Sequence, residues 1–131
     1  MLDRDIPVFC VKAASFPDGI MDAYKKLHSL TNDPHPSRYY GLSRPENGVL
    51  TYYAAAEELS PGEGEKLGCD TIIIKKGGYV SETIHDYMKD LPNISETFQK
   101  LLSTSGLDPD GYCVEWYFND TDVQCMVRLN Q

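Results

Sequence analysis

Near the carboxyl end of the chain, one acidic residue lies among aromatic residues in a pattern that fits a binding site. Glu115 stands beside Trp116 and two residues before Tyr117. The segment 112–118 favours a β-strand, in which side chains alternate between the two faces of a sheet. Glu115 and Tyr117 therefore share one face. A carboxylate in an apolar, aromatic wall attracts a cation strongly, because little water is present to screen it.

Tyrosines supply the second indication of a site. The chain has nine, and most of them fall in or beside expected strands. A tyrosine offers a ring for stacking or cation–π contact and a hydroxyl that orients a ligand, although tyrosine also favours strands for packing reasons alone. Neighbours in a strand point to opposite faces, so one member of each pair at 39–40 and 52–53 is expected to face the site. The candidate ligand-binding residues are Glu115, Tyr117, Tyr40 and Tyr52.

The strand that carries Glu115 is expected to open a β-hairpin. A polar turn at 119–122 leads into a return strand at 123–129. The apolar side of this hairpin is expected to lie under helices, and Glu115 is expected to face away from them. Trp116 then belongs to the core. The apolar side comprises Val114, Trp116, Phe118, Val123, Cys125, Val127 and Leu129.

The rest of the chain predicts two similar halves. Each half has a strand, a helix and a hairpin, and one further strand links the halves. Turn signals occur at 46–48 and at Gly77-Gly78, and a polar crossover spans 57–68. The helices are expected to begin near Pro17 and Pro92. The expected strands are 6–14, 38–42, 49–56, 71–75, 79–86, 112–118 and 123–129.

This order of elements predicts a single α+β domain over residues 1–131, with halves at about 1–58 and 69–131. Two tandem strand–helix–strand–strand modules are expected to form a curved antiparallel sheet. The two helices are expected on one face of the sheet and a cupped ligand site on the other. The sequence leaves open whether this cup is empty or filled by its own side chains.

Composition and motifs narrow the range of functions. A net charge of −8 without a long Lys/Arg cluster argues against binding to nucleic acid. No apolar stretch approaches the roughly 20 residues that span a bilayer, so no membrane association is expected. The first residues lack the apolar core of a signal peptide, so we expect a cytoplasmic protein. The four cysteines lack metal-ligand spacing and are expected to be reduced and mostly buried. No zinc, triad, phosphate-loop or dinucleotide motif appears, so neither metal nor cofactor is expected.

Several segments together resemble the GyrI-like family of small-molecule-binding domains, which also occur as effector-binding halves of AraC- and MerR-type transcription regulators. The segments are Phe16-Pro17-Asp18-Gly19-Ile20, Tyr39-Tyr40-Gly41-Leu42-Ser43, Tyr52-Tyr53-Ala54-Ala55-Ala56-Glu57, Lys75-Lys76-Gly77-Gly78-Tyr79 and Val114-Glu115-Trp116-Tyr117. The resemblance covers nearly the whole chain and implies tandem strand–helix–strand–strand modules. It also implies that Glu115 lies at the base of a ligand pocket, among aromatic rings, and pairs with cationic or polar ligand groups. No DNA-binding module precedes the domain, so a stand-alone binder is expected.

Three functions remain open at this point. The leading hypothesis is a protein that binds a small, partly aromatic compound, with a cationic compound as one option. The second is an enzyme: the resemblance includes hydrolases that act on strained or electrophilic compounds, and Glu115 with Tyr117 could then activate water as a general base. A binder is favoured, so no catalytic residue is assigned unless Glu115 is one. The third is an interaction module that inhibits or sequesters a protein partner, and exposed strand edges could also pair two copies into a homodimer.

Overall fold

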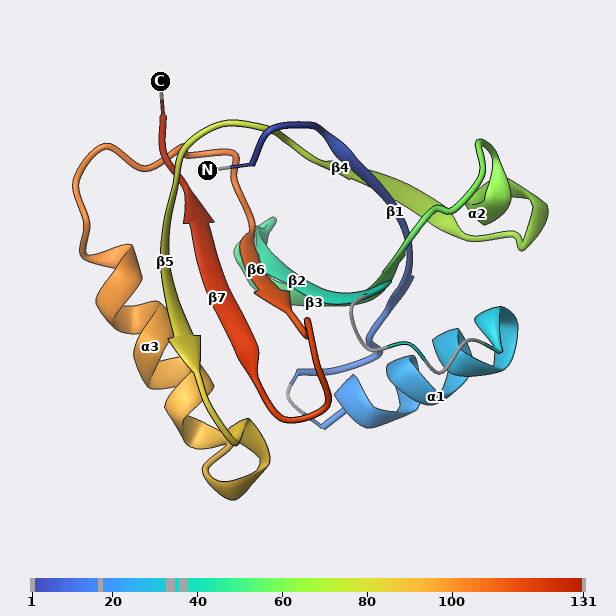
Figure 1. Cartoon of the computed structure of the whole chain (residues 1–131), viewed down its shortest axis with the longest axis horizontal. Coiled ribbons are helices and arrows are strands. Elements are labelled where there is room, and N and C mark those ends of the chain that lie inside the picture. The colour runs from blue at the N-terminus through green and yellow to red at the C-terminus, as the bar shows by residue number, and fades with distance from the viewer. Residues whose placement is uncertain (1, 17, 33–34, 36–37, 131) are drawn as a thin grey trace.

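The computed structural model describes residues 2–16, 18–32, 35 and 38–130. These residues form a strongly curved antiparallel sheet with helices on its outer, convex face (Figure 1). The strands are β1 (Ile6–Lys12), β2 (Tyr39–Glu46), β3 (Val49–Glu57), β4 (Asp70–Ile74), β5 (Tyr79–Ile84), β6 (Cys113–Trp116) and β7 (Val123–Arg128). The helices are α1 (Ile20–Thr31), α2 (Glu63–Lys66), the 3-10 turn η2 (Tyr87–Lys89) and α3 (Pro92–Leu102).

The expected α+β fold class is confirmed. The strand order β4-β1-β3-β2-β6-β7-β5 contains two equivalent sets, β1-β3-β2 and β5-β7-β6, which meet at the centre of the sheet. Each set has one long helix between its first and second strands in the chain. At the junction, Gly41 of β2 lies directly opposite Glu115 of β6. The two halves are therefore related by an approximate two-fold axis that passes close to these two residues.

The linking strand β4 lies at one edge of the sheet, and β5 lies at the other. The sequence suggested that Gly77-Gly78 turns the chain directly from one of these strands into its neighbour, and that interpretation is wrong. β4 pairs with β1, where Val8 lies opposite Ile72, and the following segment crosses to the far edge. Gly77 is held on the way by a two-way backbone bridge to Leu2.

Each long helix covers its own half of the convex face. α1 packs on β3 and β1, and α3 packs on β7 and β5. Ala23 and Leu27 form the buried side of α1, at the four-residue spacing that places side chains on one helix face. α1 begins at Ile20 after Gly19, whereas the expected start at Pro17 lies outside the described residues. α3 begins at Pro92 as predicted.

The concave face carries no helix and is filled by its own side chains. Val8, Leu42 and Ala55 have no exposed surface there, and Tyr40 and Met126 are nearly as buried. The curvature of the sheet brings these side chains from different strands into one cluster (Figure 1). The question left open by the sequence is thereby decided, because the cup is occupied by the protein itself.

The strand β6 presents its faces the opposite way from the sequence expectation, whereas β7 turns Val123, Cys125 and Val127 towards α3 as expected. Glu115 lies opposite Cys125 across the ladder, and Val114 lies opposite Met126. Directly opposed residues point to the same face, so Glu115 shares the helix-covered face with Cys125. Trp116 is on the concave side, stacked on Tyr40. The alternation along each strand was predicted correctly. The apolar residues of β6 were, however, matched to those of β7 one residue out of register, and an error of one residue exchanges the two faces of β6.

The remaining expectations concern thiols and membranes. All four cysteines are free, and Cys10 and Cys125 are buried, in agreement with the sequence. Within the described residues, no helix combines the length and the apolar character that crossing a bilayer requires.

Candidate functional site

Glu115 is a buried carboxyl group at the centre of the convex face, between the two long helices. Only 8% of its surface is exposed. The Tyr52 hydroxyl, from β3, lies 2.9 Å from Glu115 Oε1, and the Tyr117 hydroxyl makes a very short contact with the same oxygen. Two of the aromatic residues selected from the sequence thus meet the selected acid.

The space for this carboxyl group comes from Gly41. A β-carbon at Gly41 would stand 2.1 Å from the Tyr52 hydroxyl oxygen and 2.7 Å from Glu115 Oε1, both far inside van der Waals contact. Any other residue at this position would therefore displace the polar group. Sequence reasoning did not select Gly41. The available signal was a glycine inside an expected strand, which often marks a close approach of another group to the backbone.

The third tyrosine of the site comes from α1 and was also missed. The Tyr24 hydroxyl lies 3.0 Å from the Tyr52 hydroxyl and 2.8 Å from the backbone carbonyl oxygen of Tyr40. In the sequence, Tyr24 follows Ala23 on the apolar side of the expected helix, and it was not selected as a site residue. The available signal was its hydroxyl, because a buried tyrosine hydroxyl usually has a hydrogen-bond partner.

Three hydroxyl hydrogens serve four short contacts in this network. The contacts are Tyr117 to Glu115, Tyr52 to Glu115, Tyr24 to Tyr52, and Tyr24 to the Tyr40 carbonyl. Tyr52 and Tyr117 donate to Glu115 Oε1, and Tyr24 donates to the Tyr40 carbonyl oxygen, which uses all three hydrogens. The remaining contact joins the Tyr24 and Tyr52 hydroxyls, in which either oxygen can be the donor. A proton on Glu115 would let Tyr52 donate to Tyr24 instead.

The electrostatic surroundings act in the same direction. Burial raises the pKa of Glu115, and the hydrogen bonds from Tyr117 and Tyr52 offset only part of this effect. Burial also raises the pKa of Tyr24, Tyr52 and Tyr117 well above the usual tyrosine value, with the nearby carboxylate adding to the shift. The closed site therefore favours uncharged groups throughout.

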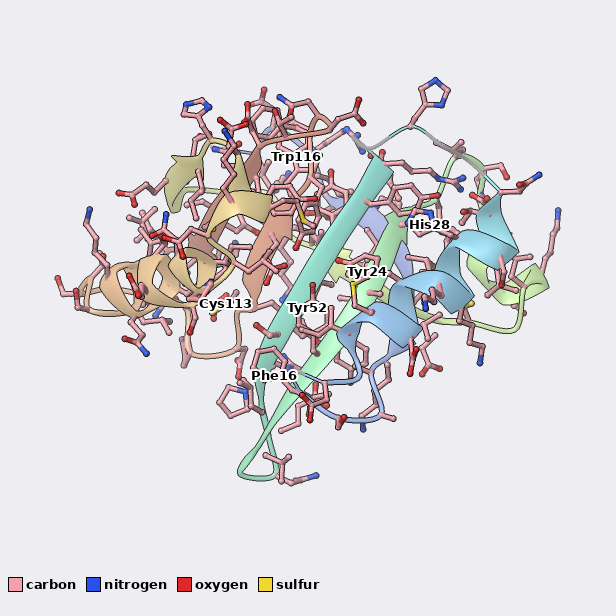
Figure 2. The ribbon with its side chains drawn as sticks, turned by 90° about the horizontal axis from the view of Figure 1, so that it is seen from below. Phe16, Tyr24, His28, Tyr52, Cys113 and Trp116 are labelled. Atoms are coloured by element: carbon pink, nitrogen blue, oxygen red, sulfur yellow. The ribbon has the colours of Figure 1, made fainter. Side chains whose placement is uncertain are left out.

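Further aromatic rings cover the network. The Phe16 ring stacks on Tyr52 with a centroid distance of 5.7 Å, and Phe16 is 42% exposed. Tyr117 lies between Tyr87, at 5.2 Å, and Tyr24, at 6.1 Å. Figure 2 shows Phe16, Tyr24 and Tyr52 close to one another beside α1. The outermost of these rings, Phe16, separates Tyr52 from solvent.

Tyr40 does not belong to the site, contrary to the sequence expectation. Its ring lies in the concave core and stacks on Trp116, and only its backbone carbonyl reaches the network. Because neighbours alternate, Tyr39 has the helix-facing side chain. That ring packs 4.4 Å from His28, and its hydroxyl contacts Thr31 at 2.6 Å, at the far end of α1. The pair at 39–40 therefore contributes no ring to Glu115.

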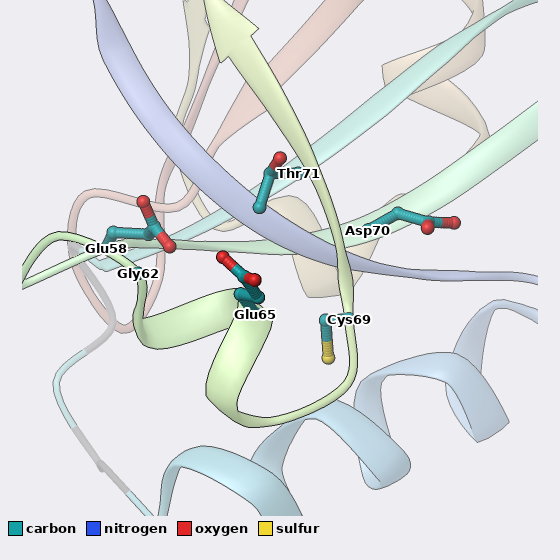
Figure 3. Close-up of a pocket in the computed structure, with 6 residues that line it drawn as sticks. All are labelled: Glu58, Gly62, Glu65, Cys69, Asp70 and Thr71. Atoms are coloured by element: carbon teal, nitrogen blue, oxygen red, sulfur yellow. The ribbon is translucent and has the colours of Figure 1, made fainter.

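Among the described residues, no cationic side chain accompanies the Glu115 carboxyl group. Over the part of the chain that the structure describes, no lysine, arginine or histidine forms an ion pair with Glu115, and no group of three or more His, Cys, Asp or Glu residues is placed to hold a metal ion. Two hollows in the surface also lie elsewhere. One is the acidic hollow beside α2 in Figure 3, and the other adjoins it along β1, with Lys12 and Lys26 on its border.

Comparisons with known proteins establish the fold alone. No family model and no curated protein matches the sequence. Among solved structures, the chain is similar to the crystal structure of a hydrolase from Listeria innocua. The TM-score is 0.62 and the sequence identity is 11%, and the match covers 99% of this chain and 89% of that one. The two proteins therefore share their architecture over almost their whole length.

Proposed function

We propose that this protein binds small aromatic cations and that it is of the GyrI-like type, with Glu115 as the polar anchor. The observation that carries the proposal is the buried Glu115 carboxyl group, which is surrounded by tyrosine hydroxyls and has no cation beside it among the described residues. A charged ligand supplies the missing partner. The tyrosine rings supply faces for cation–π contact.

The binding step exchanges a proton for the ligand. In the closed site, Glu115 completes the hydrogen-bond network as a neutral acid. A cation that enters the site favours the ionised carboxylate, because attraction between opposite charges is strong where water is excluded. Tyr52 and Tyr117 then both donate to the carboxylate. Binding is therefore expected to release a proton at a pH below the raised pKa of Glu115.

Phe16 is the residue that an incoming ring would replace. It is the most exposed ring of the site, and it stacks face to face on Tyr52. A ligand ring in the same place keeps the stacking contact with Tyr52 and brings its positive group towards Glu115. Movement of the segment before α1 is thus the conformational change that accompanies binding.

The test compares two ligands of similar size in matched variants. Benzyltrimethylammonium is the cation, and benzyl alcohol is the neutral ring. The variants are Glu115→Gln and, as a control, Glu82→Gln, which changes a carboxylate on the same face that is paired with Lys100 at the protein surface. At a hundred times the dissociation constant, a ligand that binds only the folded state adds about 2.7 kcal/mol of stability, which is readily seen as a thermal shift.

We expect the cation to stabilise the wild-type protein and Glu82→Gln and to lose its effect in Glu115→Gln. Calorimetry in buffers of different ionisation enthalpy should show proton release. Stabilisation of Glu115→Gln equal to that of the wild-type protein would remove the anchor role. Absence of any shift with a broader set of aromatic cations would remove the binding function.

A second candidate function is hydrolysis of a strained or electrophilic compound. The fold likeness to a protein described as a hydrolase favours it, together with a carboxyl group of raised pKa beside tyrosine hydroxyls. In such a reaction, ionised Glu115 takes a proton from water, the water oxygen bonds to the electrophilic carbon, and the bond from that carbon to the leaving oxygen breaks. A tyrosine protonates the leaving oxygen, and the proton on Glu115 then returns to the tyrosinate, which restores both groups. Styrene oxide is a suitable probe. Formation of the diol above the buffer rate that is abolished in Glu115→Gln would support this function, and a rate equal to buffer would exclude this substrate class.

A further inference from the structure

One edge of the sheet has backbone groups that point outward without a partner strand. On the inner side of β4, Ile73 lies opposite Pro7 of β1. Pro7 has no backbone N–H, and its carbonyl accepts from the N–H of Glu58 on the other side of β1. The Pro7–Ile73 pair is therefore a non-hydrogen-bonded pair of the ladder. The N–H and C=O groups of Ile73 consequently point away from the sheet.

The same alternation extends along the strand. Thr71 and Lys75 are two residues from Ile73 on either side, so their backbone groups also face outward. Lys76 confirms the phase, because its N–H bonds to Asp5 and its C=O accepts from Arg128, both inside the protomer. The outward groups of Thr71 and Ile73 have no bond to another described residue.

The centre of this edge carries no charged residue, proline or bulge of the kind that protects an exposed strand, and charged residues stand only at its two ends. Its centre is the run Ile72-Ile73-Ile74, and 47% of the Ile73 surface is exposed. The opposite edge differs. β5 presents exposed Ser81 and Thr83, and the Glu82 beside them is paired with Lys100 of α3. Charged and polar residues at an edge discourage pairing with another chain, whereas an apolar β-branched run favours it.

We propose that β4 pairs with β4 of a second copy of this chain, antiparallel, about a two-fold axis at Ile73. In this register, Ile73 lies opposite the same residue of the other copy. Thr71 lies opposite Lys75 of the second copy. The outward groups of Ile73 can bond to each other across the axis, and the Lys75 carbonyl oxygen, which already accepts from the Tyr79 hydroxyl, has a second lone pair for the Thr71 N–H of the second copy. The result is one continuous sheet that runs through both protomers.

Charge complementarity selects this register. A pairing centred on Ile73 places Asp70 opposite Lys76 of the second copy, and the symmetry repeats the contact, so two opposite-charge pairs flank the isoleucines. Within the described protomer, neither Asp70 nor Lys76 forms an ion pair through its side chain. Figure 3 shows the side chains of Asp70 and Thr71 leaving β4 to opposite sides, and both residues border the hollow beside α2. Opposed unlike charges stabilise neighbouring strands.

The first test is the mass in solution. Sedimentation equilibrium of the whole protein should show a species of twice 14.7 kDa that dissociates on dilution. Ile73→Lys places two like charges at the two-fold axis and should give a monomer. Thr83→Lys makes the same change of charge at the other edge and should leave the dimer intact. Near-ultraviolet circular dichroism of each variant reports whether the protomer fold is retained.

The second test examines the register and does not depend on Ile73. Asp70→Lys alone and Lys76→Asp alone each convert both ion pairs into repulsive pairs, and each should raise the dimer dissociation constant by about tenfold. The double variant restores opposite charges and should recover the wild-type constant. A wild-type monomer at several hundred micromolar, or a dimer that Ile73→Lys leaves unchanged, would overturn the proposal. A dimer weakened by both single variants without recovery in the double variant would overturn this register.

Discussion

Gly41→Ala is the smallest substitution that tests the packing of the buried carboxyl group. The added methyl would lie 2.1 Å from the Tyr52 hydroxyl oxygen and 2.7 Å from Glu115 Oε1, so both groups have to move. Overpacking of this kind costs about 1–3 kcal/mol, and breaking a hydrogen bond to a buried charged or acidic group costs a further 1.5–3 kcal/mol. We therefore expect a loss of about 3 kcal/mol, or about 10 °C in melting temperature for a domain of this size.

The assay is urea unfolding followed by the fluorescence of Trp116, the single tryptophan of the chain. Gly111→Ala is the matched control, because its added methyl would meet no atom closer than 3.3 Å and the backbone there does not need a glycine. It should change stability by less than about 0.5 kcal/mol. Tyr52→Phe removes the nearest obstructing atom, so it should couple to Gly41→Ala by at least about 1 kcal/mol in a double-mutant cycle. If Gly41→Ala is as stable as Gly111→Ala, the close packing of Glu115 over the strand is incorrect.

Three further predictions follow from the protonation states. The pKa of Glu115 is raised in the folded state, so above pH 4.5 the folded protein binds more protons than the unfolded chain. The stability that this protonation contributes is therefore complete below pH 4.5 and is lost as the pH rises through the folded-state pKa. Glu115→Gln should flatten this part of the plot of unfolding free energy against pH, and an unchanged plot would contradict the assignment. Burial raises the pKa of Tyr24, Tyr52 and Tyr117 well above the usual tyrosine value, so absorbance at 295 nm should show these three hydroxyls ionising at higher pH in the native protein than in urea. Equal titration in both states would show that the network is open to water. Burial raises the pKa of Cys125 to about 12, so a thiol reagent at pH 8 should label it only at the rate of unfolding, whereas rapid labelling in the native state would indicate an accessible site.

The sequence was sufficient for the strands and the two long helices, whereas the short helix α2 lies in the segment that was expected to be a polar crossover. Period-two alternation and turn residues located the strands, and α3 begins at the proline that predicted its start. Alternation also placed Tyr117 on the face of Glu115. These features are local, so they can be deduced from neighbouring residues along the chain.

The features that sequence reasoning missed depend on pairing between distant strands. Tyr40 was chosen over Tyr39 as a ligand-binding residue without knowledge of the register, and neither ring reaches Glu115. Tyr40 faces the concave core, and Tyr39 lies at the far end of α1. Tyr24 and Gly41 join the site only because α1 and β2 pack against the strand of Glu115. The face that carries the acid was assigned wrongly for the same reason, because a one-residue error in register exchanges the two sides of a strand.

The position of Gly41 directly opposite Glu115 has a consequence for how such a protein can arise. The two residues occupy equivalent places in the two halves, on either side of the approximate two-fold axis. A symmetric pair of identical modules would bring either two glycines or two carboxyl groups to this axis. The first arrangement has no anchor, and the second would crowd two acids into a space that accepts one. A single acid at the centre therefore requires two modules of different sequence, and in this protein both modules belong to one polypeptide.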